Sequence, residues 1–191
     1  MYKIALTGGI GTGKTYLSAH FVQMGIPVFY ADDEAKKLYA DPQFLQTIRE
    51  VFGDVVFTPN CPDQLSFVRM AEKVFSDEKA LQRLNELVHP AVMSMFEEWC
   101  TQQDAPTVMM ESAVVFEGNL THYFDKIIVA DAPVELRIQR VLARNPEMTR
   151  EQILARMAKQ MPQEEKCRRA DLVVCTGETY AAALTCSPKA P

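Results

Sequence analysis

The sequence predicts an α/β fold: a five-stranded parallel sheet flanked by helices, with an inserted helical subdomain and an arginine-bearing lid. Short apolar runs that suit buried strands alternate with helical patterns along the chain, which is typical of a parallel sheet. A glycine-rich loop separates the first apolar run from the first helical pattern. The block between the second and third strands is too long for a simple crossover, so it predicts an insertion within one domain of 191 residues.

The first strand, loop and helix are the most informative part of the chain. A buried strand is expected at residues 2–7, and a helix at residues 14–24 is ended by Gly25. The loop between them, Gly8-Gly9-Ile10-Gly11-Thr12-Gly13-Lys14-Thr15, fits the phosphate-loop pattern G-x-x-x-x-G-K-[ST] at every fixed position. Its glycines let backbone N–H groups wrap around a phosphate, and the helix N-terminus adds its positive dipole end.

Two side chains of this loop have expected roles. Lys14 would reach the β- and γ-phosphates of a nucleotide, and the hydroxyl of Thr15 could ligate Mg²⁺. The alternative is a glycine-rich turn that only starts a helix, which the strand, the four glycines and the Lys-Thr pair together disfavour.

The second strand is expected at residues 27–30, and the insertion follows it over about residues 33–103. Residues 53–63 are rich in turn residues and are expected to form a connection. A helical break is expected at His89-Pro90, because the residue before a proline is held extended. The helices expected in the insertion are a short one with Ala35, Leu38 and Tyr39 on one side, then residues 42–52, 64–75, 77–88 and 90–102.

The last third of the chain continues the alternation. Pro133 suits the first turn of a helix that runs to residue 144, and Thr149 with Gln152 forms a plausible capping box for a helix over residues 149–161. A short helix is expected after Gly177, and the last residues should form a frayed tail. The remaining strands are expected at residues 107–111, 126–130 and 172–175.

Ligands bind beyond the carboxyl ends of the strands in an open parallel sheet, so the residues after each strand are candidates. Asp32 could accept a proton from an attacking hydroxyl or hold a Mg²⁺-bound water, or Asp32 and Asp33 could simply cap the next helix. The residues at these ends are Asp32, Asp33, Glu111, Asp131 and Thr176.

Three arginines recur at spacings of three and four residues, hence on one helical face: Arg137, Arg140 and Arg144. Arg140 and Arg144 precede a breakable Asn-Pro turn and suggest a mobile lid, over about residues 144–166, that carries arginines to the phosphates. The alternative is a solvated face balanced by glutamates, which we expect for Arg150, Arg168 and Arg169.

Composition excludes several classes of function. The net charge of −5 makes nucleic acid an unexpected partner, and no apolar run approaches the length of a membrane span. The N-terminus shows no signal-peptide pattern, and the five cysteines form no Cys-x-x-Cys pair. We therefore expect a cytoplasmic protein with reduced thiols that acts on small molecules. We also expect a monomer or a weak homo-oligomer, although the sequence does not give the oligomeric state.

The chain resembles the dephospho-coenzyme A kinase family, collinearly from Ile4 to Gly177. The phosphate loop is shared by many kinases, whereas the His-Pro element, the apolar run that ends in Glu117 and the Arg-x-x-x-Arg pair are more specific together. The matching pieces are residues 6–15, 25–28, Ala31-Asp32, residues 84–90, residues 111–117, residues 140–144, Ala158-Lys159-Gln160 and Ala170-Asp171.

The resemblance implies a reaction in which ATP, with Mg²⁺, phosphorylates the ribose 3′-hydroxyl of dephospho-coenzyme A, the last step of coenzyme A biosynthesis. It implies that Asp32 is the base, that Lys14 and Arg144 hold the transferring phosphate, and that the helical insertion binds the acceptor. His89 and Glu117 would line the acceptor side together with Asp32. The residues implied at the nucleotide are Gly8, Gly9, Gly11, Thr12, Gly13, Lys14, Thr15, Tyr16 and Arg140, with Thr15 at the metal.

Two positions depart from the family pattern: Tyr30 replaces an aspartate, and Thr176 replaces an asparagine in a loop near the adenine. A kinase for nucleosides or nucleoside monophosphates is an alternative. A nucleotide-dependent switch is another, although a guanine-specific switch would carry an Asn-Lys-x-Asp motif that this chain lacks.

Overall fold

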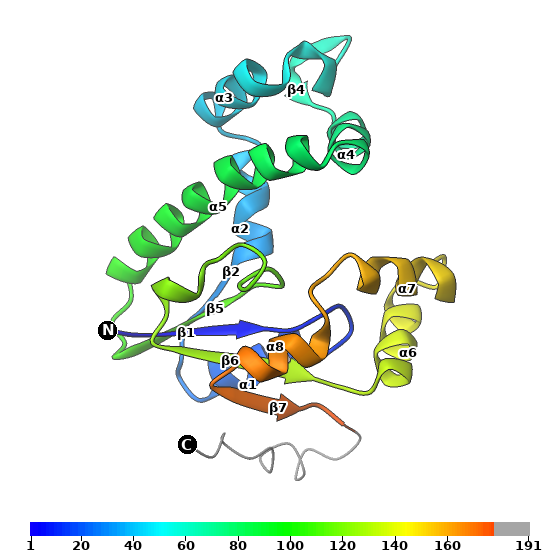
Figure 1. Cartoon of the computed structure of the whole chain (residues 1–191). Coiled ribbons are helices and arrows are strands. Elements are labelled where there is room, and N and C mark those ends of the chain that lie inside the picture. The colour runs from blue at the N-terminus through cyan, green and yellow to red at the C-terminus, as the bar shows by residue number, and fades with distance from the viewer. Residues whose placement is uncertain (178–191) are drawn as a thin grey trace. The chain divides into compact units, whose positions relative to one another are not determined.

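A computed structural model describes residues 1–177, and its main sheet has five parallel strands (Figure 1). This confirms the predicted fold class. The expected helix after Gly177 and the expected tail lie outside the described residues. The strands, in spatial order, are β2 (Val28–Tyr30), β5 (Thr107–Glu111), β1 (Tyr2–Thr7), β6 (Lys126–Asp131) and β7 (Leu172–Cys175).

The central strand β1 lies where the order of the sheet reverses, between β5 and β6. Leu6 pairs with Glu111 of β5 on one side and with Ile128 of β6 on the other. Ligands bind at the carboxyl end of such a switch point in open parallel sheets. The loop after β1, residues 8–13, occupies that place.

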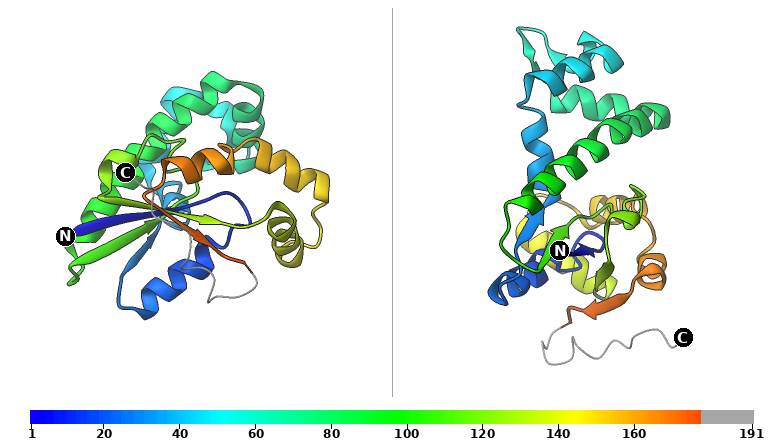
Figure 2. Two further views of the ribbon diagram at one scale, coloured as in Figure 1. Left: turned by 60° about the horizontal axis from the view of Figure 1, so that its bottom comes forward. Right: turned by 90° about the vertical axis from the view of Figure 1, so that its left-hand side faces the viewer.

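Both faces of the sheet are covered, because alternate residues of β1 lie in different apolar clusters (Figure 2). Leu6 packs with Leu17 of α1, whereas Ala5 packs with Val115 and Phe116 of the segment after β5. The helices of this part of the chain are α1 (Lys14–Gln23), α6 (Val134–Arg144), α7 (Arg150–Ala158) and α8 (Gln163–Arg169), with a 3-10 turn at Thr121–Tyr123.

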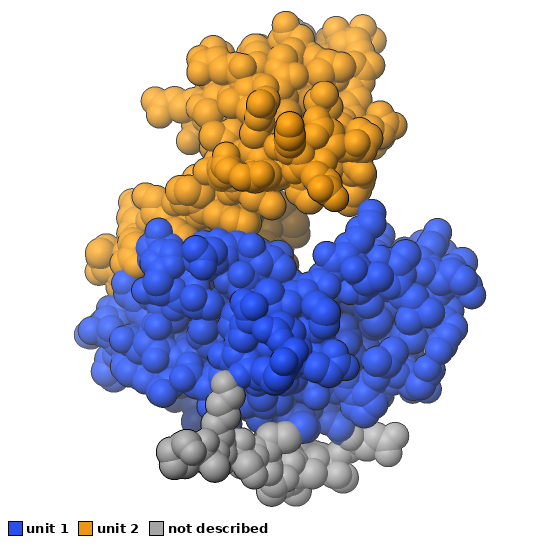
Figure 3. Space-filling model, in the orientation of Figure 1, with its two compact units in different colours: residues 1–30, 102–191 blue, residues 31–101 orange. Residues whose placement is uncertain are grey.

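The chain divides into two compact units, which Figure 3 colours separately: unit 1 holds Met1–Tyr30 and the chain from Gln102 onward, and unit 2 is Ala31–Thr101. The predicted insertion, about residues 33–103, covers nearly the same range. Unit 2 contains α2 (Ala31–Leu38), α3 (Pro42–Phe52), a 3-10 turn (Asp54–Val56), β3 (Phe57–Thr58), β4 (Cys61–Leu65), α4 (Phe67–Ser76) and α5 (Glu78–Thr101).

Unit 2 has a hydrophobic core of its own. Phe57 is fully buried in it, and the guanidinium carbon of Arg49 lies 4.2 Å from the centroid of the Phe57 ring. Leu84 and Leu87 of α5 pack against this core. The buried members are Ile48, Phe52, Val56, Phe57, Leu65, Met70, Val74 and Ala80.

Two local predictions for unit 2 were wrong, and one helix of unit 1 was missed. The expected break at His89-Pro90 is absent, because α5 is one helix with Pro90 inside it. Packing on both sides of the proline outweighs the lost hydrogen bond, since Ala80 is buried before it and Val92 and Phe96 after it. The expected connection over residues 53–63 contains the antiparallel pair β3–β4, and α8 was not predicted at all.

The capping box of α7 is confirmed, with Gln152 and Thr149 each bonding the other's backbone N–H. The solvated arginines are also confirmed, since Arg150 pairs with Glu135 and both Arg168 and Arg169 pair with Glu165. No helix within residues 1–177 is long and apolar enough to cross a bilayer.

Candidate active site

The loop after β1 curls around the N-terminus of α1 with its backbone held in conformations that favour glycine. Gly13 forms the N-cap with φ of 88°, and no side chain of the described residues caps this helix end. A helix N-terminus without a capping side chain presents unpaired N–H groups and the positive dipole end to an anion. The structure therefore fits a phosphate at this point.

Side chains also fix the loop from within. The Thr12 hydroxyl donates to the Gly9 carbonyl at 2.8 Å, and Lys14 Nζ donates to the Gly8 carbonyl at 3.0 Å. A Cβ on Gly11 would lie 2.5 Å from the backbone oxygen of Arg137, so the close approach of α6 requires glycine there. The loop is thus shaped by its neighbours as well as by its own sequence.

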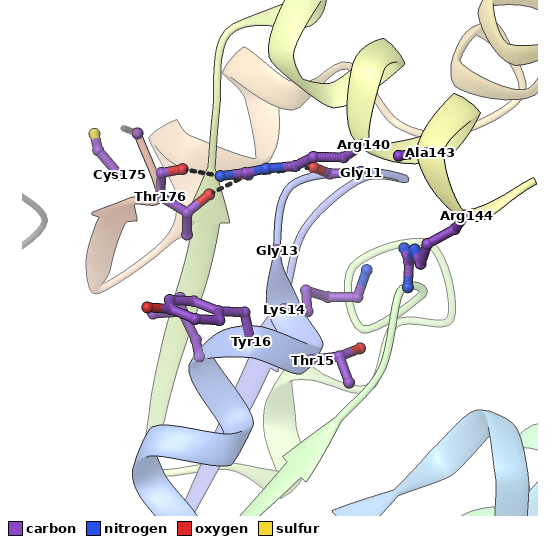
Figure 4. Close-up of a pocket in the computed structure, with 12 residues that line it drawn as sticks. Gly11, Gly13, Lys14, Thr15, Tyr16, Arg140, Ala143, Arg144, Cys175 and Thr176 are labelled. Atoms are coloured by element: carbon purple, nitrogen blue, oxygen red, sulfur yellow. Dashed lines mark hydrogen bonds between the residues drawn. The ribbon is translucent and has the colours of Figure 1, made fainter. Parts of the chain in front are cut away.

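A cavity of about 500 Å³ opens beside this loop (Figure 4). In the figure, the side chains of Lys14 and Arg144 point into the same part of it, away from Cys175 and Thr176. The structure therefore brings together most of the residues expected at a nucleotide. The lining residues are Gly11, Gly13, Lys14, Thr15, Tyr16, Leu17, Arg140, Ala143, Arg144, Cys175, Thr176 and Gly177.

Arg140 is held at the wall of this cavity by Thr176. One of its nitrogens donates to Thr176 Oγ1 at 2.8 Å, and the other donates to the Thr176 carbonyl oxygen. The Thr176 hydroxyl also lies 2.5 Å from the carbonyl oxygen of Thr12 and 3.3 Å from that of Asp131. Thr176, which departs from the family pattern, thus connects the phosphate loop, the end of β6 and α6 through hydrogen bonds.

A carboxylate lies beside the loop hydroxyls. Glu111, the last residue of β5, places Oε1 3.5 Å from Thr15 Oγ1 and Oε2 3.2 Å from Ser18 Oγ. Sequence reasoning named Glu111 as a strand-end residue but gave it no role. The missing information was the strand order: β5 is the neighbour of β1, so its carboxyl end faces the loop.

These oxygens fit a magnesium ion. Mg²⁺ prefers hard oxygen ligands, and in kinase sites it takes one or two protein ligands together with water and phosphate oxygens. No group of three or more His, Cys, Asp or Glu residues that could hold a metal by itself occurs within residues 1–177, so the phosphate oxygens would complete the coordination.

Glu117 and the end of the predicted lid form a second anchored region. The carboxylate of Glu117 pairs with Lys166 Nζ at 2.7 Å and accepts from the Met161 N–H at 3.0 Å. Lys166 is fully buried and also donates to the Ala113 carbonyl at 2.8 Å. Lys166 was included in the expected mobile range, but its contacts fix the start of α8 to the segment after β5.

Asp32 and His89 belong to unit 2. Both aspartates after β2 lie exposed in the first turn of α2, where Asp33 pairs with Lys36 at 2.7 Å. His89 lies half-buried within α5, and burial lowers the pKa of its imidazole. A neutral imidazole can both accept and donate a hydrogen bond.

The family model described as dephospho-CoA kinase matches residues 2–181. The chain belongs to the dephospho-CoA kinase family. A dephospho-CoA kinase of Deinococcus radiodurans is 39% identical over 175 residues, which cover 90% of this chain and 82% of that protein. One of Bacteroides fragilis is 35% identical over 174 residues, covering 90% of this chain and 83% of that protein.

A solved structure agrees with the fold. The crystal structure of TT1252 from Thermus thermophilus has a TM-score of 0.81 and 32% identity, and the match covers 93% of this chain and 90% of that chain. The resemblance seen in the sequence is therefore confirmed at the level of the dephospho-CoA kinase family and of the phosphate-loop kinase fold.

Proposed function

We propose that this chain is a dephospho-CoA kinase that transfers the γ-phosphoryl group of ATP to the ribose 3′-hydroxyl of dephospho-CoA, giving CoA and ADP. The observation that carries the proposal is the family match over residues 2–181, which spans both the built phosphate loop and the insertion. The cavity beside the loop supports it, because lysine and arginine side chains enter the same part of that space.

The residues around the loop have distinct proposed roles. Lys14 and Arg144 hold the transferring phosphoryl group and balance the charge that develops on its oxygens. The Thr15 hydroxyl and the Glu111 carboxylate would hold Mg²⁺, which would supply positive charge beside the phosphates. Arg140, anchored by Thr176, borders the adenine, and Tyr16 lines the same cavity.

The acceptor side of the proposal rests on unit 2 and on Glu117. Asp32 takes the proton of the 3′-hydroxyl as that oxygen attacks the γ-phosphorus atom. His89 donates or accepts a hydrogen bond to the acceptor, and unit 2 supplies the substrate-binding insertion. Glu117 lines the acceptor side as well, and its carboxylate also binds Met161 and Lys166.

A lid is part of the proposal, with a narrower range than the sequence suggested. Its movable portion lies between Arg144 and the start of α7. Ile153 of α7 is buried in the cluster that Ile10 packs against, and the contacts of residues 160–166 attach them to the loop, to Glu117 and to β6. We also propose that the enzyme is cytoplasmic, acts on small molecules without nucleic acid or membrane, and is a monomer or a weak homo-oligomer.

A substrate panel tests the reaction. Purified protein with ATP and Mg²⁺ receives dephospho-CoA, adenosine or nucleoside monophosphates, and ADP release and the phosphorylated product are both measured. Dephospho-CoA should be by far the best acceptor, because its remote parts supply binding energy that positions the hydroxyl. Equal turnover of adenosine, or phosphorylation elsewhere than the 3′-oxygen, would contradict the proposal.

A further inference from the structure

Ile10 of the phosphate loop is held at three points by parts of the chain that lie far from it in sequence. Its N–H donates to Gln160 Oε1 at 2.9 Å, and its carbonyl accepts from Arg137 Nε at 3.0 Å. Its side chain packs against the apolar cluster formed by α6 and α7, in which Ile138 and Ile153 are buried.

The preceding residue is held in the same way. The Gly9 N–H donates to Gln163 Oε1 at 3.0 Å, and Gln163 Nε2 donates to the Ala130 carbonyl at the end of β6 at 2.9 Å. The amide of Gln163 therefore connects the loop to the sheet, while that of Gln160 connects it to the segment between α7 and α8.

These bonds determine the orientation of consecutive peptide planes. A peptide plane whose N–H is bonded to a fixed acceptor cannot turn that N–H toward the phosphate cavity or away from it. The plane between Ile10 and Gly11 is fixed in addition by Arg137, which is only 5% exposed. The loop therefore has its shape before any ligand arrives.

The two glutamines are themselves held in place. Met161, between them in the chain, donates its N–H to Glu117 at 3.0 Å, and the buried Lys166 pairs with the same carboxylate at 2.7 Å. The segment from Gln160 to Lys166 is thus attached at four residues, which gives it the rigidity that a supporting group for a binding loop requires.

We infer that Gln160 and Gln163 are positioning residues of the phosphate loop, acting through the N–H groups of Ile10 and Gly9. This inference rests on the proposed use of the loop for ATP. Neither side chain lines the cavity, so neither needs to touch the nucleotide. Their effect is to spare ATP the cost of ordering the loop, which should appear in the affinity for ATP and not in the chemical step.

Gln160→Met tests this, because methionine keeps the length and removes the acceptor. The Ile10 amide should exchange with solvent faster, and the KM for ATP and the Kd for Mg·ATP from calorimetry should rise about three- to tenfold, the usual worth of one hydrogen bond. The kcat and the KM for dephospho-CoA should stay near those of the parent. Gln160→Glu keeps an acceptor oxygen and should restore protection of the Ile10 amide.

Two further variants keep the test decisive. Gln163→Met should deprotect the Gly9 amide in the same way, which tests the inference if the first variant folds poorly. Gln23→Met, at an exposed position in the last turn of α1, is the matched control and should change neither exchange nor ATP affinity.

The outcomes separate the two proposals. Folded Gln160→Met and Gln163→Met proteins with unchanged loop exchange and unchanged ATP affinity would overturn this inference, whatever the acceptor is. If kcat and the melting temperature of these variants both fell while their ATP affinity stayed constant, the inference would also be overturned, and the glutamines would have a structural role alone. Normal Mg·ATP binding without turnover of dephospho-CoA would instead count against the proposed reaction.

Discussion

At the scale of single residues, Thr176 shows how one hydroxyl can support a binding site. Thr176→Val keeps the shape but leaves the carbonyl of Thr12 and the guanidinium of Arg140 without this partner. We expect a loss of about 1–3 kcal/mol in the free energy of unfolding, together with a higher KM for ATP. Urea denaturation and steady-state kinetics measure both quantities.

The matched control for that variant is Thr101→Val, at an exposed position at the end of α5. It should leave both quantities near those of the parent. If Thr176→Val were as stable as the parent and bound ATP equally well, the hydroxyl would have no supporting role.

The two adjacent aspartates of α2 should behave differently. Asp32→Asn removes the proposed proton acceptor and should lower kcat by about 10²–10⁴, with little change in ATP affinity. Asp33→Asn removes only a solvent-exposed ion pair with Lys36, which contributes little because water screens it, and should leave kcat nearly unchanged. The reverse pattern in single-turnover kinetics would show that the catalytic assignment is displaced by one residue.

At the scale of elements, α5 carries a titratable group whose charged form is disfavoured by burial. Because the pKa of His89 is lowered in the folded chain, the unfolded chain binds a proton more readily. The contribution of His89 to the free energy of unfolding is therefore complete above its ordinary pKa of about 6.5. It is lost as the pH falls from there toward the lower pKa of His89 in the folded chain.

The variant His89→Gln tests this dependence. It should reduce the loss of stability between about pH 6.5 and the lower pKa of the folded state, while its stability at pH 8 serves as the internal reference. Denaturation curves over that range give the slopes. Equal slopes in parent and variant would show that other groups account for the acid sensitivity.

The helix α5 also shows that tertiary packing can override a local sequence rule. The rule for the residue before proline predicted two helices, yet one helix runs from Glu78 to Thr101 because it is buried on both sides of Pro90. Likewise, the turn residues in 53–63 did not indicate the strand pair β3–β4. These strands form because their apolar residues pack in the core of unit 2, and no alternation of apolar and polar residues marks them.

At the scale of the whole molecule, each unit buries its own core, so we expect them to differ in stability. Phe57→Ala should cost about 3–5 kcal/mol within unit 2 and make that unit melt first. The single tryptophan, Trp99, stacks on Phe96 in α5 and reports on unit 2, whereas calorimetric Mg·ATP binding reports on unit 1. Loss of both signals at one temperature would show that the units unfold together.

The sheet and the phosphate loop could be predicted because they follow from local patterns. A buried strand, a glycine-rich turn and a helix start are all visible within the first twenty or so residues, and the switch-point rule then locates the site. The supporting role of Arg137, Gln160 and Gln163 could not be predicted, because they reach the loop through tertiary contacts. The spacing of Arg137 placed it on one helical face with Arg140 and Arg144 but did not show that it binds the loop backbone.

The close packing of α6 against the loop has a consequence for how such sequences can change. A Cβ on Gly9 would lie 2.5 Å from the guanidinium of Arg137, and one on Gly11 would lie equally close to the Arg137 backbone. Both glycines stand at positions where the phosphate-loop pattern accepts any residue. A substitution at residue 11 should therefore require a backbone shift of α6, whereas one at residue 9 requires only that the Arg137 side chain move.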